Sequence, residues 1–216
     1  MIDENLIAEL VRRKIVTETF RRLPPAKKEK LYSAALHIFA KYGYDGMAID
    51  QYCANARISK GSFFQYFPSK THLLEFALLL FDNSLTEVSK KLRETETAVM
   101  AKDRLLQLIL ALGGKDVLQA VEKKFYLFAV NSLHHSAVAV EGMQLERHLY
   151  DFISEVIRRA VETREVRSDY ATEATIRFAA RTIDGILTDF FLSGKIPERE
   201  TTVPLIEYLF DGIKNQ

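Results

Sequence analysis

Apolar residues recur at intervals of three and four along most of this chain, which is the spacing of one face of an α-helix. Beyond Asp103 no segment alternates strictly between apolar and polar residues, as a half-buried strand would. Prolines and glycines separate the periodic segments. The pattern predicts an all-α protein with helices over residues 1–23, 26–42, 49–56, 59–67, 69–92, 103–112, 116–135, 141–164, 169–193 and 202–214.

Two short predicted helices, 49–56 and 59–67, follow each other closely. Ser59 is suited to cap the second helix, because its hydroxyl can accept a hydrogen bond from the first turn. Phe63 and Phe67 stand four residues apart, so both rings would be buried against the first helix. This arrangement predicts a helix-turn-helix whose second helix turns five side chains outward: Lys60, Ser62, Phe64, Gln65 and Tyr66.

The outward face of the second helix is chemically suited to DNA. Lysine neutralises phosphate, glutamine can make two hydrogen bonds to an adenine edge, and Gly61 lets the backbone approach closely. Lysines also crowd the first turn of the 26–42 helix, where cations oppose the helix dipole unless a phosphate lies nearby. The expected DNA-binding residues are Lys27, Lys28, Ser59, Lys60, Gly61, Ser62, Phe64, Gln65, Tyr66 and Lys70. Any corner between two helices has the same spacing, so the motif alone leaves that alternative open.

A longer set of residues surrounds this motif. It comprises Phe39, Gly43, Ile49, Ala56, the run Ile58 to Phe64, the run Tyr66 to Lys70, and Leu73-Leu74. Together these residues resemble the DNA-binding domain of the TetR/AcrR family of bacterial transcriptional regulators, over about Lys27 to Leu80. The resemblance implies a homodimer that binds a double-stranded operator, a larger helical domain that binds a small-molecule effector, and a helix after Pro68 that couples the two.

Three positions depart from the family pattern. Met47-Ala48 stands where the family usually has a threonine, Arg57 stands where it has a turn glycine, and Phe64 stands where it has a tyrosine. Arginine adopts a positive φ less readily than glycine, and a phenylalanine ring cannot donate a hydrogen bond to phosphate. These departures motivate an alternative function, a helical ligand-binding or adaptor dimer that has lost specific DNA binding.

Composition and charge narrow the class of protein further. The chain has 216 residues, of which 48% are hydrophobic, so it can bury the core of one or two domains. Its one cysteine excludes an internal disulfide and a cysteine-built zinc site, and no apolar run is long enough to span a membrane. A cytoplasmic protein is therefore expected. Eight basic and three acidic residues give positions 22–70 a net charge of +5, while the rest of the chain carries −4, as a DNA-binding segment requires.

The same observations predict three parts. Residues 1–23 form an extra N-terminal helix or arm, residues 24–70 form the helix-turn-helix DNA-binding domain, and residues 71–216 form the ligand-binding and dimerisation domain. The first part combines an apolar stripe with several basic residues. It could contact DNA phosphates or pack on its own domain, and the second interpretation is favoured because the stripe needs a partner.

The third part supplies candidates for an effector pocket and a dimer interface. A mostly apolar lining with a few polar groups would suit a hydrophobic or amphipathic effector. The expected ligand-binding residues are Phe125, Phe128, Asn131, His135, Tyr150, Phe152 and Phe178. Two broad apolar helix faces near the C-terminus suit a four-helix seam between protomers. The expected interface residues are Ile183, Leu187, Phe190, Ile206 and Phe210. Both sets could equally be plain core, because helical spacing does not distinguish a core from a pocket.

No metal site, cofactor or catalytic motif is predicted. Side chains of the adjacent His134 and His135 would point about 100° apart on a helix, and no i, i+4 partner completes a metal site with them or with His148. The sequence shows no Gly-rich phosphate loop and no nucleophile elbow. The predicted function is a ligand-responsive transcriptional repressor that its effector releases from the operator. A helical enzyme without a motif is a further alternative that nothing supports directly.

Overall fold

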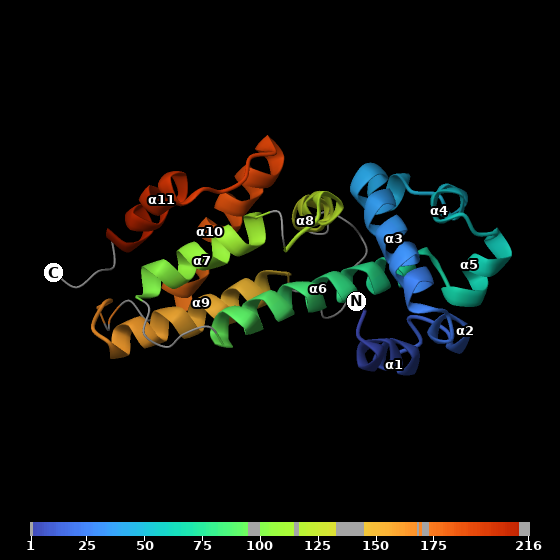
Figure 1. Ribbon diagram of the computed structural model, residues 1–216, viewed down its shortest axis with the longest axis horizontal. Coiled ribbons are helices and arrows are strands. Elements are labelled where there is room, and N and C mark those ends of the chain that lie inside the picture. The colour runs from blue at the N-terminus through green and yellow to red at the C-terminus, as the bar shows by residue number, and fades with distance from the viewer. Residues whose placement is uncertain are drawn as a thin grey trace. The chain divides into compact units, whose positions relative to one another are not determined.

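The computed structural model describes residues 2–94, 100–114, 117–132, 145–167, 169 and 173–211, and within them the side chains of all but 131–132 and 145–149. These residues form no β-strand, so the predicted all-α class is confirmed for the part of the chain described (Figure 1). The helices are α1 (Glu4–Arg12), α2 (Glu18–Arg21), α3 (Pro25–Gly46), α4 (Ile49–Ala56), α5 (Lys60–Tyr66), α6 (Lys70–Glu94), α7 (Ala101–Gly113), α8 (Ala120–Ser132), α9 (Leu145–Glu162), α10 (Glu173–Ser193) and α11 (Arg199–Asp211). None of the described helices is long and apolar enough to cross a membrane.

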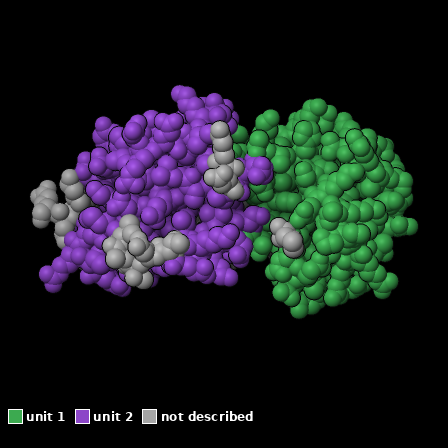
Figure 2. All heavy atoms as spheres, in the orientation of Figure 1, with its two compact units in different colours: residues 1–83, 120–143 green, residues 84–119, 144–216 purple. Residues whose placement is uncertain are grey.

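Packing divides the chain into two compact units, which Figure 2 colours separately. Unit 1 comprises residues 1–83 and 120–143, and unit 2 comprises residues 84–119 and 144–216. The boundary falls inside α6, and α8 belongs to unit 1, where it packs against α3. The expected functional boundary after residue 70 stays a prediction, because units defined by packing need not coincide with units defined by function.

The N-terminal segment forms two helices where one was predicted. Lys14 adopts a φ of 61° and ends the first helical stretch, and Thr17 then caps α2 by accepting a hydrogen bond from the Phe20 N–H at 3.2 Å. Side-chain capping by threonine favours a new helix start over continuation of the old one. The apolar stripe is buried in unit 1 through Ile7, Leu10, Ile15, Val16 and Phe20, so the segment packs on its own unit.

Aromatic rings hold α5 in place within unit 1. Phe63 and Phe67 are fully buried, as their spacing predicts. The Phe63 ring lies 5.7 Å from that of Tyr52 in α4, and the Phe67 ring lies 5.3 Å from Phe20 and 5.2 Å from Phe76, measured between ring centroids. Each aromatic pair contributes about 0.5–1.5 kcal/mol beyond its buried area. Helices α2, α4 and α6 therefore fix the buried side of α5, and its opposite side is left to solvent.

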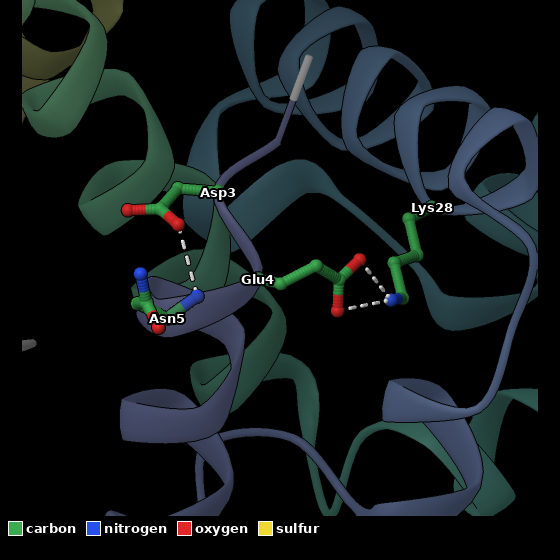
Figure 3. Close-up of polar contacts among 4 residues, drawn as sticks. All are labelled: Asp3, Glu4, Asn5 and Lys28. Carbon is green, nitrogen blue, oxygen red and sulfur yellow. Dashed lines mark hydrogen bonds and ion pairs between the residues drawn. The ribbon is translucent and has the colours of Figure 1, made fainter.

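Lys28 of α3 is buried, with 2% of its surface exposed. Its ammonium pairs with the Glu4 carboxylate at 2.7 Å and 3.0 Å, and Asp3 caps the same end of α1 by accepting from the Asn5 N–H at 2.9 Å (Figure 3). The expectation that Lys28 contacts DNA is corrected by this geometry, because a buried, paired ammonium is not presented to a phosphate. Lys28 instead joins α3 to α1.

Unit 2 is a bundle in which α7 contacts α9, α10 and α11. Its core consists of aliphatic side chains such as Leu108, Ile157 and Ile183, all fully buried. A Cβ atom on Gly113 would lie 2.3 Å from Cγ of Pro197, so only glycine fits where the end of α7 meets the loop before α11. The absence of a Cβ at Gly113 therefore lets the loop approach the end of α7 closely.

Candidate nucleic-acid interface

The turn between α4 and α5 has the geometry of a glycine turn without the glycine. Arg57 adopts a left-handed backbone with φ 55° and ψ 52°, and its N–H donates to the Ala54 carbonyl at 3.3 Å. The next N–H, that of Ile58, donates to the Cys53 carbonyl at 3.0 Å. An L-residue with a Cβ pays of order 1 kcal/mol or more for this conformation. The turn nevertheless forms, and the Arg57 side chain is exposed beside α5.

The start of α4 lacks the usual side-chain cap. Ala48 occupies the N-cap position and has no side-chain acceptor, so one half of a capping box is missing. The other half is present, because Oε1 of Gln51 accepts a hydrogen bond from the Ala48 N–H at 2.9 Å. Gln51 thus compensates in part for the absent threonine.

The start of α5 is capped as predicted. Oγ of Ser59 accepts a hydrogen bond from the Ser62 N–H at 3.0 Å, and the two hydroxyls lie 2.9 Å apart. Beyond this cap the outward side carries Lys60, Gly61, Phe64 and Gln65, all exposed, while Ser62 is half-buried. Half of the Phe64 surface, 50%, is open to solvent, which is unusual for so large an apolar ring.

Lys60 is held next to α4 by an exposed ion pair. Its ammonium lies 3.0 Å from the Asp50 carboxylate, and both side chains are more than half exposed. Exposed pairs of this kind contribute between about 0 and 1 kcal/mol. A phosphate group can therefore replace Asp50 at little cost.

Tyr66 faces the interior of unit 1, which corrects the expectation that it points outward. It is buried, its ring meets that of Phe20 edge-on at 6.3 Å, and its hydroxyl accepts a hydrogen bond from Nζ of Lys27 at 3.2 Å. The physical reason is that α2 covers this end of α5, which the spacing within residues 59–67 does not reveal. Lys27 itself remains exposed.

Lys70 links α6 to the loop before α4. Its ammonium donates to the carbonyls of Tyr44 at 2.9 Å and Met47 at 3.1 Å, and it lies 4.4 Å from the centre of the Tyr44 ring. These contacts occupy the charge that was expected to bind phosphate. In this structure Lys70, the half-buried first residue of α6, stabilises the contact between α6 and this loop.

One residue of this region was missed by sequence reasoning. Thr17 donates through its backbone N–H to the Tyr66 carbonyl at 3.1 Å and through its hydroxyl to the Gln65 carbonyl. A threonine followed by Glu18 is a signal for a helix start. The signal locates α2, but it carries no information about a partner 48 residues away.

Comparisons with known proteins agree with this geometry. Residues 31–77 match the family model described as bacterial regulatory proteins, tetR family. This part of the chain is therefore similar to the DNA-binding region of that family. A curated HTH-type transcriptional regulator, YuxN of Bacillus subtilis (strain 168), is 39% identical over 64 residues, which are 29% of this chain. The match spans only 22% of the length of YuxN.

Solved structures share the fold of most of the chain. FadR, the fatty acid degradation regulator of Bacillus halodurans, superposes with a TM-score of 0.68 at 17% identity, covering 90% of this chain and 100% of its own. FadR of Bacillus subtilis in complex with stearoyl-CoA has a TM-score of 0.62 at 16% identity, with coverages of 85% and 96%. A gamma-butyrolactone receptor has a TM-score of 0.62 at 16% identity, with coverages of 87% and 97%. The fold is therefore that of these structures, an N-terminal helix-turn-helix domain followed by a larger helical domain.

Burial controls the chemistry of Cys53 in α4. Burial raises the pKa of the Cys53 thiol, and the nearby Asp50 charge raises it further. The Sγ–H of Cys53 contacts the Ser59 carbonyl at 3.9 Å. Cys53 therefore behaves as a small apolar residue, because a raised pKa disfavours the reactive thiolate.

The residues expected to bind an effector divide between the two units. Phe125 and Phe128 are buried in unit 1, where Phe125 packs against Phe81 at 5.4 Å and Phe128 stacks on Phe39 at 6.0 Å. These contacts belong to the packing of α8 on α3 and α6. The side chain of Asn131 and all of His135 lie outside the described residues.

The remaining effector candidates lie in unit 2. Tyr150 is half-buried, and Phe152 is buried between two guanidinium groups, with Arg93 at 5.9 Å and Arg104 at 5.7 Å from its ring centre. Phe178 was expected in the same lining, but 63% of its surface is exposed. Phe178 is therefore no longer a candidate ligand-binding residue, because its side chain faces solvent on α10.

The expected dimer residues lie on the inner side of the last two helices. Ile183, Leu187, Ile206 and Phe210 are buried within unit 2, and Phe190 is half-buried. A side chain that is already buried leaves little surface to cover with a partner, but no partner chain is present, so the dimer interface stays a prediction. Each of these helices also keeps large apolar side chains exposed, which are Phe178 and Leu192 on α10 and Leu205 and Tyr208 on α11.

Proposed function

We propose that this protein is a homodimeric transcriptional repressor that binds a double-stranded operator and leaves it when a hydrophobic or amphipathic small molecule binds. The outward side of α5 carries the proposal. There a capped helix start, an exposed lysine, an exposed glutamine and an exposed aromatic ring share one short helix. A bacterial repressor acts where the chromosome is, so the cytoplasm follows as its proposed location.

In this proposal α5 enters the major groove of DNA, as the second helix of a helix-turn-helix does. Lys60 exchanges Asp50 for a phosphate oxygen, because the ion pair that holds it is exposed and weak. Gln65 faces the base edges, where an amide can bond to both N6 and N7 of adenine. Phe64 contacts a deoxyribose or a thymine methyl group, since its ring has no hydrogen-bond donor.

Two copies of the chain are needed, because an operator with two half-sites requires two helix-turn-helix domains at a fixed spacing. The exposed face of α10 and α11, defined by Phe178, Leu192, Leu205 and Tyr208, is the proposed dimer interface. Phe178 and Leu192 are 14 residues apart, so the face extends about 21 Å along α10 at 1.5 Å per residue. A solvent-exposed apolar face of this extent is typical of an interaction surface.

Sedimentation analysis tests the dimer interface directly. Phe178→Asp together with Tyr208→Asp should convert the dimer to a monomer, because two carboxylates would be buried without partners. The control is Met100→Asp, which places one carboxylate on an exposed apolar residue of the same unit, at the N-cap of α7. A double variant that remains as dimeric as the control would contradict this interface.

Salt-dependent DNA binding tests the central claim. Duplex fragments from the DNA flanking the gene should bind more tightly than scrambled duplexes, and the affinity should fall steeply with salt. Lys60→Gln should lower the slope of log K against log salt by about 0.9, the value for one lost phosphate contact. Lys195→Gln, at an exposed lysine of unit 2, should leave the slope unchanged. Weak binding that ignores sequence would favour the adaptor alternative.

The effector is proposed to act by shifting the population of the dimer toward a spacing that no longer fits the operator. Stearoyl-CoA is a suitable first probe, because it is bound in one structure that shares this fold. If it binds, it should raise the melting temperature and weaken operator binding. Linkage requires that operator DNA weaken ligand binding by the same factor. A ligand that binds without changing operator affinity would contradict the release mechanism, and turnover of the ligand would point to an enzyme.

A further inference from the structure

Helix α5 ends in a way that leaves its last carbonyls without local donors. It has seven residues, and Phe67, which follows it, is extended with φ −127° and ψ 126°. The last four carbonyls of any helix have no partner inside the helix, and a left-handed residue at C′ usually turns the chain to satisfy them. Here the chain leaves in an extended direction, and Pro68 has no N–H to offer.

From the N-terminal segment, Thr17 supplies donors for the last two of these carbonyls. Its backbone N–H donates to the Tyr66 carbonyl at 3.1 Å, and its hydroxyl donates to the Gln65 carbonyl at 2.5 Å. The same hydroxyl oxygen accepts from the Phe20 N–H at 3.2 Å. Thr17 therefore caps the start of α2 and the end of α5 at once, and Figure 1 shows these two helices side by side.

The surrounding contacts hold Thr17 in place. The preceding residues Ile15 and Val16 are each only 2% exposed. On the other side, the Phe20 ring packs within 5.0 Å of Phe76 and 5.3 Å of Phe67. The position of Thr17 is thus set by packing on both sides, so its two donors are pre-organised for the carbonyls of α5.

We propose that the N-terminal segment, residues 3–22, stabilises α5 in the orientation needed for DNA recognition, and that Thr17 is the positioning residue of this segment. By capping α5 from outside the motif, Thr17 holds the helix turn that carries Phe64 and Gln65 in the orientation needed to meet base edges. The inference rests on the proposed DNA-binding function. It assigns the N-terminal segment a role in specificity that requires no contact between the segment and DNA.

Three substitutions separate the two capping roles of Thr17. Thr17→Ser keeps both roles, Thr17→Val loses both side-chain roles, and Thr17→Asp keeps an acceptor for the Phe20 N–H but has no hydrogen to donate to Gln65. Thr201→Val is the matched control, because it removes a threonine hydroxyl that bonds locally to the Glu198 carbonyl at 3.0 Å in unit 2. Far-UV circular dichroism confirms that each variant is folded.

The first measurement is amide hydrogen exchange in the protein without DNA. Exchange at the Phe63 and Phe67 amides should speed up about three- to tenfold in Thr17→Val and Thr17→Asp, which is the effect of losing one hydrogen bond. Thr17→Ser and Thr201→Val should exchange as the wild type does. Unchanged exchange in Thr17→Asp would overturn the cap, whether or not the protein binds DNA.

The second measurement is affinity for the operator and for scrambled duplex. Thr17→Val and Thr17→Asp should lose about three- to tenfold in the ratio of the two affinities, and Thr17→Ser should restore it. A purely structural role would lower the melting temperature and leave this ratio unchanged, and that result would overturn the positioning role. If the wild type binds no DNA, the proposed function fails, while the exchange experiment still decides the cap.

Discussion

The ammonium of Lys28 lies 2.7 Å from Oε1 of Glu4, joining α3 of the helix-turn-helix region to the first turn of α1. The lysine side chain is 3% exposed, so its charge depends on this one carboxylate, which is itself largely open to water. A buried charge that loses its partner keeps its desolvation cost and loses its compensation. The N-terminal segment is therefore electrostatically coupled to the rest of unit 1.

The pair predicts an asymmetry between its two members. Glu4→Gln should lower the free energy of unfolding by about 1–3 kcal/mol, because it leaves the buried ammonium without its counter-charge. Lys28→Met should cost less, since it removes the charge and keeps most of the apolar stem. Glu18→Gln, in an exposed pair with Arg21 at 3.5 Å, is the control and should cost under about 0.5 kcal/mol. Urea denaturation measures all three, and equal costs for Glu4→Gln and Glu18→Gln would refute the coupling.

Substitution of Arg57 tests the energetic cost of the left-handed turn. Arg57→Gly should leave the free energy of unfolding unchanged or raise it by up to about 1 kcal/mol, because glycine adopts φ 55° without a Cβ clash but loses more backbone entropy. Arg57→Ala removes the same charge but keeps the Cβ, so it should show no gain. If both variants lower the salt slope of DNA binding by about 0.9, then Arg57 contacts a phosphate.

Phe64 predicts a neutral or favourable substitution. Phe64→Tyr should leave operator affinity intact or improve it slightly, because the exposed ring has room for a hydroxyl that can donate to a phosphate. Fluorescence anisotropy with a labelled operator duplex measures the change. A large loss of affinity would show that the ring is enclosed by DNA in a site too tight for one more oxygen.

Gln65 predicts a change in specificity as well as in affinity. Gln65→Ala should weaken operator binding by about 1–3 kcal/mol and relax the preference at a single base pair, as expected for an amide that reads adenine. Gln107→Ala, at a half-buried glutamine of α7, is the control. Competition against a panel of single-base operator variants makes the measurement. An equal loss on every duplex would reassign Gln65 to a phosphate contact.

Tyr52 predicts alkaline sensitivity. Burial raises the pKa of its phenol well above the usual 10.0, and the neighbouring Cys53 adds to the shift. The phenol of Tyr52 thus has a higher pKa in the folded protein than in the unfolded chain. Its contribution to stability is complete below pH 10 and is lost as the pH rises from there toward the folded pKa, because in that range only the unfolded chain ionises. Tyr52→Phe removes this dependence, while losing the hydroxyl's bond to the Leu31 carbonyl, worth about 1 kcal/mol.

Urea denaturation between pH 7 and pH 11 distinguishes these two effects. The wild type should be the more stable protein at pH 7, and its advantage over Tyr52→Phe should shrink or reverse above pH 10. Tyr42→Phe, at an exposed tyrosine, is the control for the substitution itself. Wild type and Tyr52→Phe declining in parallel above pH 10 would contradict the prediction.

Local features of the DNA-binding motif were predictable from the sequence because their partners are near in the chain. The Ser59 cap bonds three residues ahead, and the buried pair Phe63 and Phe67 follows from helical spacing alone. A turn at Arg57 was also expected, because the resembled family has a turn glycine at this position. Such features depend on backbone geometry and on interactions within one helical turn, which sequence order specifies directly.

Tertiary structure alone decided the features whose partners are distant. Lys28 is buried because α1 folds over it, and Tyr66 is covered because α2 reaches the end of α5. One side of α10 packs into the core of unit 2, while its opposite side stays exposed. An apolar stripe shows that a helix face must be covered, but not by what, because the hydrophobic effect has no direction. Most of the helices, the helix-turn-helix motif and its outward side chains other than Tyr66 were therefore predictable from local sequence order. Which lysines, aromatic rings and apolar faces remain available to DNA or to a partner was decided only by the packing of segments far apart in the chain.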